Sequence, residues 1–140
     1  MTDKEIEIQY ALGSLPIKVL RKLPYNKKTS PRILDVLSND EDLNIISNIA
    51  ENPNTPEHTL FKIFQMCKEY IGQSFEYNLA LNPSLPVKLL VKLSKSRHTA
   101  VRCNVAGNPN TPKDILVKLA NNSDKGVRYN AAKNLRNMGY

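Results

Sequence analysis

The sequence Val101-Arg102-Cys103-Asn104-Val105-Ala106-Gly107-Asn108-Pro109-Asn110-Thr111-Pro112 contains a six-residue motif that occurs four times in the chain. The motif reads Asn, an aliphatic residue, Ala, any residue, Asn and Pro. Its copies begin at Asn48, Asn78, Asn104 and Asn130, and the last copy lacks the proline. The second asparagines stand at positions 52, 82, 108 and 134, so the steps are 30, 26 and 26 residues. A fixed period of this length is typical of repeat architectures, and we predict tandem units of about 26 residues.

Each unit is predicted to begin with a helix, called helix A, that ends at the motif. Apolar residues stand seven and three positions before the second asparagine, and alanine stands two before it. This spacing places them on one helical stripe. The stripe residues are Ile45, Ile49 and Ala50; Phe75, Leu79 and Ala80; Val101, Val105 and Ala106; and Val127, Ala131 and Ala132. The small alanine indicates a close approach to the neighbouring unit.

A two-proline turn is expected to separate helix A from a second helix, helix B. A residue that precedes proline is disfavoured in the α region, so Asn52-Pro53 and Asn108-Pro109 should end helix A. We predict Thr55 and Thr111 as N-caps of helix B, each followed by proline at the first helical position. Leu85 takes the place of the threonine in the third unit, and Leu85→Thr is expected to be neutral or mildly stabilising.

Helix B is predicted from apolar residues three, four and seven positions after the second proline of the turn. They are Leu60 and Ile63 with Thr59; Leu89, Leu90 and Leu93; Ile115, Leu116 and Leu119; and Ile33, Leu34 and Leu37, where Ser30 replaces the proline. Helices of two to three turns are marginal alone, so stacking of units must stabilise them. The pattern contains no strands and predicts an all-α solenoid, a stack of helix-pair repeats.

The whole chain, 1–140, is predicted to form one domain. It divides into an N-terminal capping helix region (1–25), repeats (26–134) and a C-terminal tail (135–140). Residues 15–23 have the text of helix B but occupy the place of helix A in the 26-residue frame, and both roles remain open. The columns of asparagines are interpreted as partners for backbone groups at helix ends, in preference to a recognition face. The acidic run Asp40, Glu41 and Asp42 is interpreted as a favourable charge at a helix start.

The repeat text resembles the leucine-rich repeat variant family. The resemblance covers roughly residues 26–134 and is carried by Val101 to Pro112, by Ile115-Leu116 and Leu119-Ala120, and by Val127-Arg128. It implies a short right-handed superhelix related to HEAT and armadillo arrays, with helix A partly 3₁₀, and no general activity. The chain departs from the family at Leu85 and at Glu76, which stand where the family has Thr and Arg, and at 26–30, which lack the first proline. The iron–sulfur segment of some members has no counterpart here.

Charge gives the candidate binding site. Residues 1–70 carry 9 basic and 10 acidic side chains, whereas residues 71–140 carry 11 and 3. Lysines recur on helix B and arginines on helix A, in phase with the repeat. The candidate binding residues are Lys88, Lys92, Arg102, Lys118 and Arg128. A solvated face and an anion-binding surface both fit these ladders. Phe75, Tyr77 and Tyr129 are the candidates for stacking on bases, and Phe75 is also expected in the core.

The most favoured function is a non-enzymatic module that binds another protein. The alternative is weak, sequence-independent nucleic-acid binding through the basic C-terminal half. An enzyme of the DNA-glycosylase kind is a third hypothesis that rests on fold analogy alone, with Asp114 and Asp124 as the only aspartates of the basic half.

No catalytic motif occurs in the sequence, and the two cysteines and two histidines form no ligand set, so no metal or cofactor is expected. The residues concerned are Cys67, Cys103, His58 and His98. No apolar run is long enough to span a bilayer, and the N-terminus lacks signal-peptide features, so we expect no membrane association and a cytoplasmic location. The oligomeric state stays open.

Overall fold

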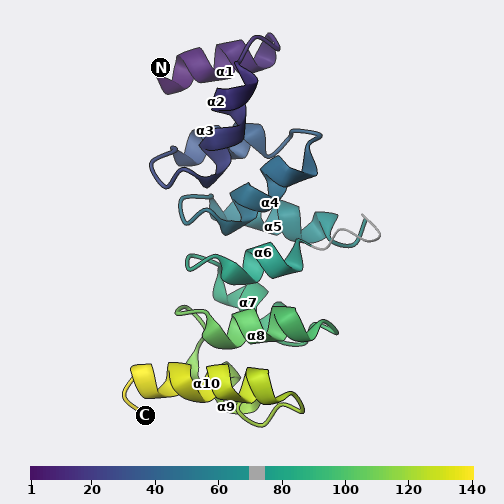
Figure 1. The fold of residues 1–140 in the computed structure, drawn as a ribbon, viewed down its shortest axis with the longest axis vertical. Coiled ribbons are helices and arrows are strands. Elements are labelled where there is room, and N and C mark those ends of the chain that lie inside the picture. Colours follow the sequence, from purple (N-terminus) through teal and green to yellow (C-terminus); the bar gives the residue numbers. More distant parts are fainter. Residues whose placement is uncertain (70–74) are drawn as a thin grey trace.

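The computed structural model describes residues 1–69 and 75–140. Within those residues every regular element is a helix, which confirms the all-α prediction for the described part of the chain. The helices follow one another along the long axis, and the two termini lie at its opposite ends (Figure 1). The extra residues that the 30-residue step places between Cys67 and Ser74 fall largely on 70–74, which lie outside the described residues.

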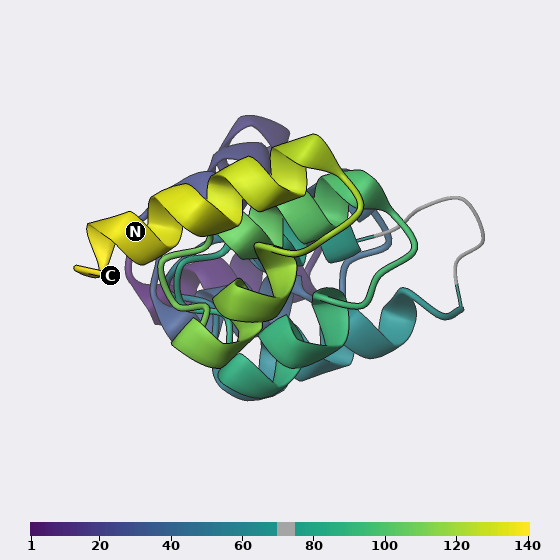
Figure 2. The same ribbon diagram turned by 90° about the horizontal axis from the view of Figure 1, so that it is seen from below.

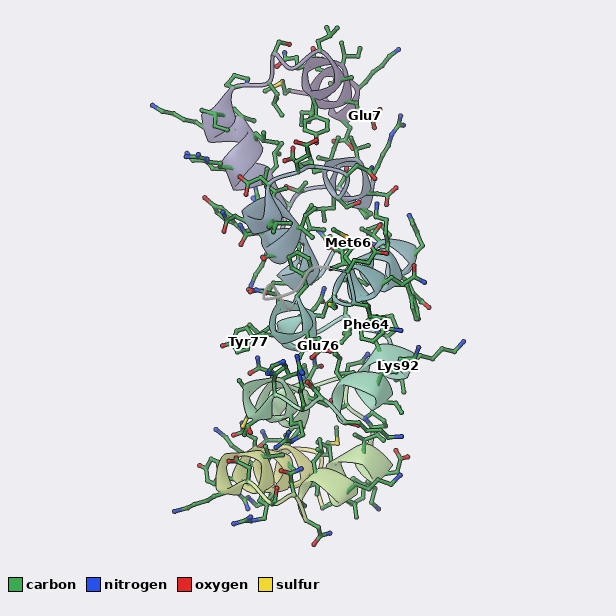
Figure 3. All side chains as sticks on the ribbon, turned by 90° about the vertical axis from the view of Figure 1, so that its right-hand side faces the viewer. Glu7, Phe64, Met66, Glu76, Tyr77 and Lys92 are labelled. Carbon is green, nitrogen blue, oxygen red and sulfur yellow. The ribbon has the colours of Figure 1, made fainter. Side chains whose placement is uncertain are left out.

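The helices form two columns that run side by side along the long axis (Figure 3). The A column contains α2 (Ile17–Lys22), the 3₁₀ helix η1 (Leu23–Tyr25), α4 (Leu43–Glu51), α6 (Glu76–Leu81), α8 (Thr99–Gly107) and α10 (Lys125–Asn137). The B column contains α1 (Asp3–Ala11), α3 (Pro31–Leu37), α5 (Glu57–Met66), α7 (Val87–Leu93) and α9 (Lys113–Leu119). Viewed along the axis, α8 and α10 lie on one side and α7 and α9 on the other (Figure 2). The predicted helices A and B of the successive units therefore occupy separate columns.

The apolar stripes predicted from the repeat form one continuous core. Leu34, Ile49, Leu79, Leu90 and Leu116, for example, are fully buried. Along the A column, successive helices contact each other from η1 to α10. The motif alanines of α4, α6 and α8 are also fully buried, in agreement with the close approach that their size predicts. Burying these stripes is the main stabilising term, because each helix alone is too short to persist.

The position of the N-terminal segment decides between the two roles left open for residues 15–23. The η1 turn packs against α4, so α2 and η1 take the place of helix A in the first unit. In the B column α1 packs against α3, and Ser30 donates a hydrogen bond to Asp3 at 2.6 Å. Residues 3–11 thus supply the B-column partner, although their sequence does not follow the repeat text.

The second asparagine of each motif is buried and joins two successive units. The Nδ2 of Asn108 donates to the carbonyl oxygens of Ala80 and Asn82, both at 2.8 Å, while its Oδ1 accepts from the backbone N–H of Asn110 at 2.9 Å. The same pair of donated bonds links Asn52 to Pro24 and Asn26, Asn82 to Ala50 and Asn52, and Asn134 to Ala106 and Asn108. The structural interpretation of this asparagine column is confirmed.

The prediction that Thr55 and Thr111 cap helix B is wrong. The N-cap positions are held by the following prolines, without a side-chain cap. The threonine hydroxyls point backwards instead and donate to the carbonyls of Ile49 and Val105, at 2.6 and 2.7 Å. These carbonyls lie near the C-terminal end of helix A, where no intrahelical N–H is available, so the bond satisfies a buried acceptor.

Leu85 also differs from its prediction, because it is a core residue with none of its surface exposed. It lies at the same place as the two threonines, and its side chain fills that place with apolar atoms. Replacing Leu85 with threonine must therefore remove buried apolar surface and cannot simply restore a cap.

The C-terminal end is more helical than predicted. Helix α10 continues three residues beyond Asn134, to Asn137, because no proline follows that asparagine. The predicted tail, 135–140, is therefore partly helical. The chain then turns back, and the Lys113 ammonium lies 3.9 Å from the centroid of the Tyr140 ring. In the described part of the chain, every helix is too short or too polar to cross a bilayer.

Candidate functional site

The lysine ladder lies on the B column, and part of it connects neighbouring units. The Lys62 ammonium donates to the Ser38 hydroxyl and, at 3.2 Å, to Oδ1 of Asn39. One unit later the Lys92 ammonium lies 5.5 Å from the centroid of the Phe64 ring, a cation–π distance (Figure 3). Each of these two lysines reaches back to the preceding helix of the B column. Their charges therefore have a partner within the fold.

Lys88 and Lys118 are exposed on α7 and α9. Within the described residues neither side chain makes a hydrogen bond or an ion pair. These two lysines remain available to an external anion, in contrast to Lys62 and Lys92. They lie two helices of the same column apart, at the repeat step.

The arginine ladder is occupied by backbone carbonyls. Arg102 Nη1 donates to the carbonyl of Ser96 at 2.8 Å, and Arg128 Nη1 donates to those of Asn122 and Ser123 at 2.9 and 3.0 Å. These carbonyls belong to the loops that connect helix B to the next helix A. Arg102 is half-buried, and its Nε has no hydrogen-bond partner among the described residues. The arginines stabilise the interhelical loops and contribute less to a surface than their spacing predicted.

The five predicted binding residues therefore do not form one site. Lys88, Lys92 and Lys118 project from the B column, whereas Arg102 and Arg128 lie on A-column helices and bind loop carbonyls. The predicted stacking residues also separate, because Phe75 is buried in the core while Tyr77 and Tyr129 are exposed.

Exposed aromatic and aliphatic side chains gather instead on the outer side of the A column. Tyr25, Tyr77 and Tyr129 expose 58%, 45% and 61% of their surface, and Leu81 exposes 42%. We call this surface the A-helix face and define it by these four residues. Tyr77 and Leu81 are four residues apart in α6 and so share a side of the helix. Tyr77 and Lys92 lie on opposite sides of the molecule, so the A-helix face and the lysine ladder are separate surfaces (Figure 3).

Two recesses lie between successive A-column elements on this side. One, of about 120 Å³, is lined by Tyr25, Lys27, Asn48, Glu51, Asn52 and Pro53. The other, of about 510 Å³, is lined by Gly107, Pro109, Asn130, Lys133, Asn134, Asn137 and Met138. Tyr25 and Gly107 both directly precede a second asparagine, so the recesses are equivalent places in different units. The sequence analysis did not identify them, nor Tyr25 and Leu81 as surface residues.

The acidic run is part of the α3–α4 connection. The Asp42 side chain caps α4 by accepting from the N–H of Asn44 at 2.9 Å, as its position at a helix start predicted. Asp40 accepts from the Tyr10 hydroxyl at 2.7 Å, which joins α1 to this loop. Burial and the hydrogen bond to Asp40 raise the pKa of Tyr10 above its ordinary value. A recess of about 560 Å³ beside the loop is lined by Ser38, Asn39, Asp40, Glu41, Leu43, Lys62 and Met66.

The cysteines and histidines are dispersed. Cys67 is half-buried, and burial raises the pKa of its thiol to about 11, so the thiolate is disfavoured near neutral pH. His58 contacts Asp35 at 3.0 Å, and His98 lies beside Arg97. Over residues 1–69 and 75–140 no group of three metal-ligating side chains comes together. Asp124, one of the two aspartates considered for catalysis, caps α10 by accepting from the N–H of Val127.

Comparison with known proteins gives no relative: no family model, no curated protein and no solved structure matches the chain. The functional argument consequently rests on the A-helix face, the recesses and the lysines described above.

Proposed function

We propose that the chain is a short α-solenoid that acts as a non-enzymatic interaction module and binds an extended segment of another protein across the A-helix face. The solenoid arrangement is supported by the 26-residue period and by the buried asparagine that makes the same two bonds to the preceding unit in four successive cases. The resemblance to the leucine-rich repeat variant family is consistent with this arrangement and extends the proposal to a right-handed superhelix.

The observation that carries the binding function is the exposure of Tyr25, Tyr77 and Tyr129 along one side of a rigid stack. Tyrosine offers a large, amphipathic contact area at a small cost in conformational entropy, and it is enriched in protein interfaces. The fold makes little use of these three rings, because each exposes about half of its surface or more. Tyr77 and Tyr129 are two units apart, which corresponds to roughly 20 Å at the usual spacing of packed helices.

An extended peptide matches this layout. A strand-like segment advances about 3.3 Å per residue, so about six residues span the distance between Tyr77 and Tyr129. Motif asparagines lie beside the tyrosines and can exchange hydrogen bonds with peptide groups. The Asn104 side chain, for example, makes only one long bond, at 3.4 Å, to the carbonyl of Tyr77. The proposal includes no catalysis, since the sequence contains no catalytic motif.

Nucleic-acid binding is the second candidate, and the exposed Lys88 and Lys118 favour it. The structure weakens this candidate relative to the sequence analysis, because Arg102 and Arg128 are bonded to loop carbonyls. Two lysines can neutralise about two phosphates, which supports only weak binding.

A selection from a library of displayed random peptides, with the full chain immobilised, tests the proposal. Binding of the most enriched peptide is then measured by fluorescence anisotropy for wild type and variants. Tyr77→Ala and Tyr129→Ala should each weaken binding by about fivefold or more, the effect of losing an aromatic contact worth about 1 kcal/mol. Lys88→Gln and Lys118→Gln, on the other column, are matched surface controls and should leave it unchanged. Absence of enrichment, or sensitivity to the lysines instead of the tyrosines, would overturn the proposal.

A further inference from the structure

The recess of about 510 Å³ between α8 and α10 differs from its equivalent at Tyr25 mainly in one residue. The residue before the second asparagine is Tyr25, Glu51, Leu81, Gly107 and Lys133 in the five successive units. Only Gly107 has no side chain. Where Tyr25 stands at this position, the recess holds about 120 Å³. The missing side chain at Gly107 therefore accounts for much of the larger opening, which we call the Gly107 recess.

The fold does not require a glycine at this place. Gly107 has no positive φ, and a Cβ added to it would meet nothing within 4 Å. Glycine also lowers helix stability relative to alanine, and Gly107 is the last residue of α8. Neither backbone conformation nor packing explains the residue, so the open space itself is the feature that the glycine creates.

The lining of the Gly107 recess is cationic and rich in amides. It contains Lys133 together with Asn130, Asn134 and Asn137, and no carboxylate. The Nδ2 of Asn134 is used by its two bonds to the preceding unit, and Asn130 donates to the carbonyl of Cys103 at 3.2 Å. Within the described residues the side chains of Lys133 and Asn137 make no hydrogen bond or ion pair. An ammonium and an amide donor are thus available at the recess.

We propose that the Gly107 recess receives an aspartate or glutamate side chain of the segment bound on the A-helix face. Lys133 pairs with the carboxylate, and the Asn137 amide donates a hydrogen bond to it. The excess of 11 basic over 3 acidic side chains in residues 71–140 adds a long-range attraction for an acidic segment. This inference rests on the proposed function and specifies the chemistry of the partner, an acidic peptide.

The test is a titration of the isotopically labelled full chain with a blocked tripeptide, acetyl-Ala-Glu-Ala-amide, followed by nuclear magnetic resonance at low ionic strength. The matched probe is acetyl-Ala-Gln-Ala-amide, which has the same shape without the charge. We expect saturable shifts of the Gly107 backbone amide and the Asn137 side-chain amide with the glutamate peptide. The glutamine peptide should bind at least about threefold more weakly, as expected for the loss of one exposed ion pair.

Two variants with matched controls locate the site. Gly107→Leu fills the recess and should abolish the shifts, whereas Ala100→Leu adds the same side chain two turns earlier on α8 and should not. Lys133→Gln should weaken binding by about threefold, whereas Lys125→Gln, at the far end of α10, should have no effect. The unperturbed part of each spectrum reports whether the variant is folded.

Equal responses to the two peptides, shifts that survive Gly107→Leu, or no saturable shift at the recess would each overturn the inference. The inference and the proposed function fail separately. If selected peptides still bind through Tyr77 and Tyr129 while the recess remains silent, only the acidic specificity is wrong. If no peptide is enriched at all, the proposed function itself is wrong.

Discussion

Replacing Asn108 with alanine should be among the most damaging single changes in this chain. The side chain is 3% exposed and makes three hydrogen bonds, two of them to carbonyls of the preceding unit. Alanine leaves the carbonyls of Ala80 and Asn82 and the N–H of Asn110 without this partner. A buried polar group without a partner costs about 1–3 kcal/mol, and part of the N–H cost is relieved by solvent, since Asn110 is exposed. We expect a loss of about 3 kcal/mol in the free energy of unfolding.

Urea denaturation followed by the helical circular dichroism signal measures this loss. With a slope of about 2 kcal/mol per molar urea, 3 kcal/mol lowers the midpoint by about 1.5 M. The matched control is Asn104→Ala, in the same motif. Its side chain makes a single bond of 3.4 Å, and alanine favours the helix, so its midpoint should move by no more than about 0.3 M.

Asn108→Asp provides a further check on the geometry. It keeps the size and the acceptor but replaces the donor with an oxygen that faces two carbonyls. Burial and these carbonyls should raise the pKa of the folded carboxyl above its unfolded value, so the destabilisation is present at neutral pH and disappears as the pH falls below the unfolded pKa. Equal midpoint shifts for Asn108→Ala and Asn104→Ala would refute the reasoning that the buried asparagine connects the units.

Three other predictions follow from the structure. Leu85→Thr should destabilise the fold by about 1–2 kcal/mol in the same assay, since the loss of a buried leucine exceeds the gain of one hydrogen bond; a neutral result would restore the cap interpretation. The Thr59 hydroxyl, with His58 and Lys62, lowers the pKa of Asp35 below its ordinary value, so its contribution is present above the unfolded pKa and is lost as the pH falls through the folded one; Asp35→Asn should flatten the acid limb of the stability–pH curve. Any binding of oligonucleotides, measured by anisotropy, should show a log K against log salt slope of about −2, and a slope near −4 would mean that Arg102 and Arg128 contact phosphate after all.

The repeat frame, the two helices of each unit and their apolar stripes could be predicted from the sequence, because period and spacing depend only on residue order. The buried asparagine column also followed, since the same residue recurs at a helix end in each unit. The direction of the Thr55 hydroxyl did not follow. A threonine before proline is compatible with a cap and with a bond to the preceding helix, and only the angle between helices A and B distinguishes them.

The candidate surfaces were harder to predict for the same reason. Arg102 and Arg128 recur in phase as Lys88 and Lys118 do, yet the arginines reach the carbonyls of the adjacent loop and the lysines reach solvent. The Gly107 recess depends on which position of one helix faces the next unit. That position could have been identified by aligning the residues before each second asparagine, where glycine stands among four larger side chains.

The measurement that most directly tests the central claim is the mapping of a selected peptide onto the labelled chain by chemical-shift perturbation. The account predicts that the perturbed residues lie on the A-helix face and its recess, at Tyr77, Leu81, Gly107 and Tyr129. Perturbation of Lys88, Lys92 and Lys118 on the B column, with the A-helix face unchanged, would contradict it.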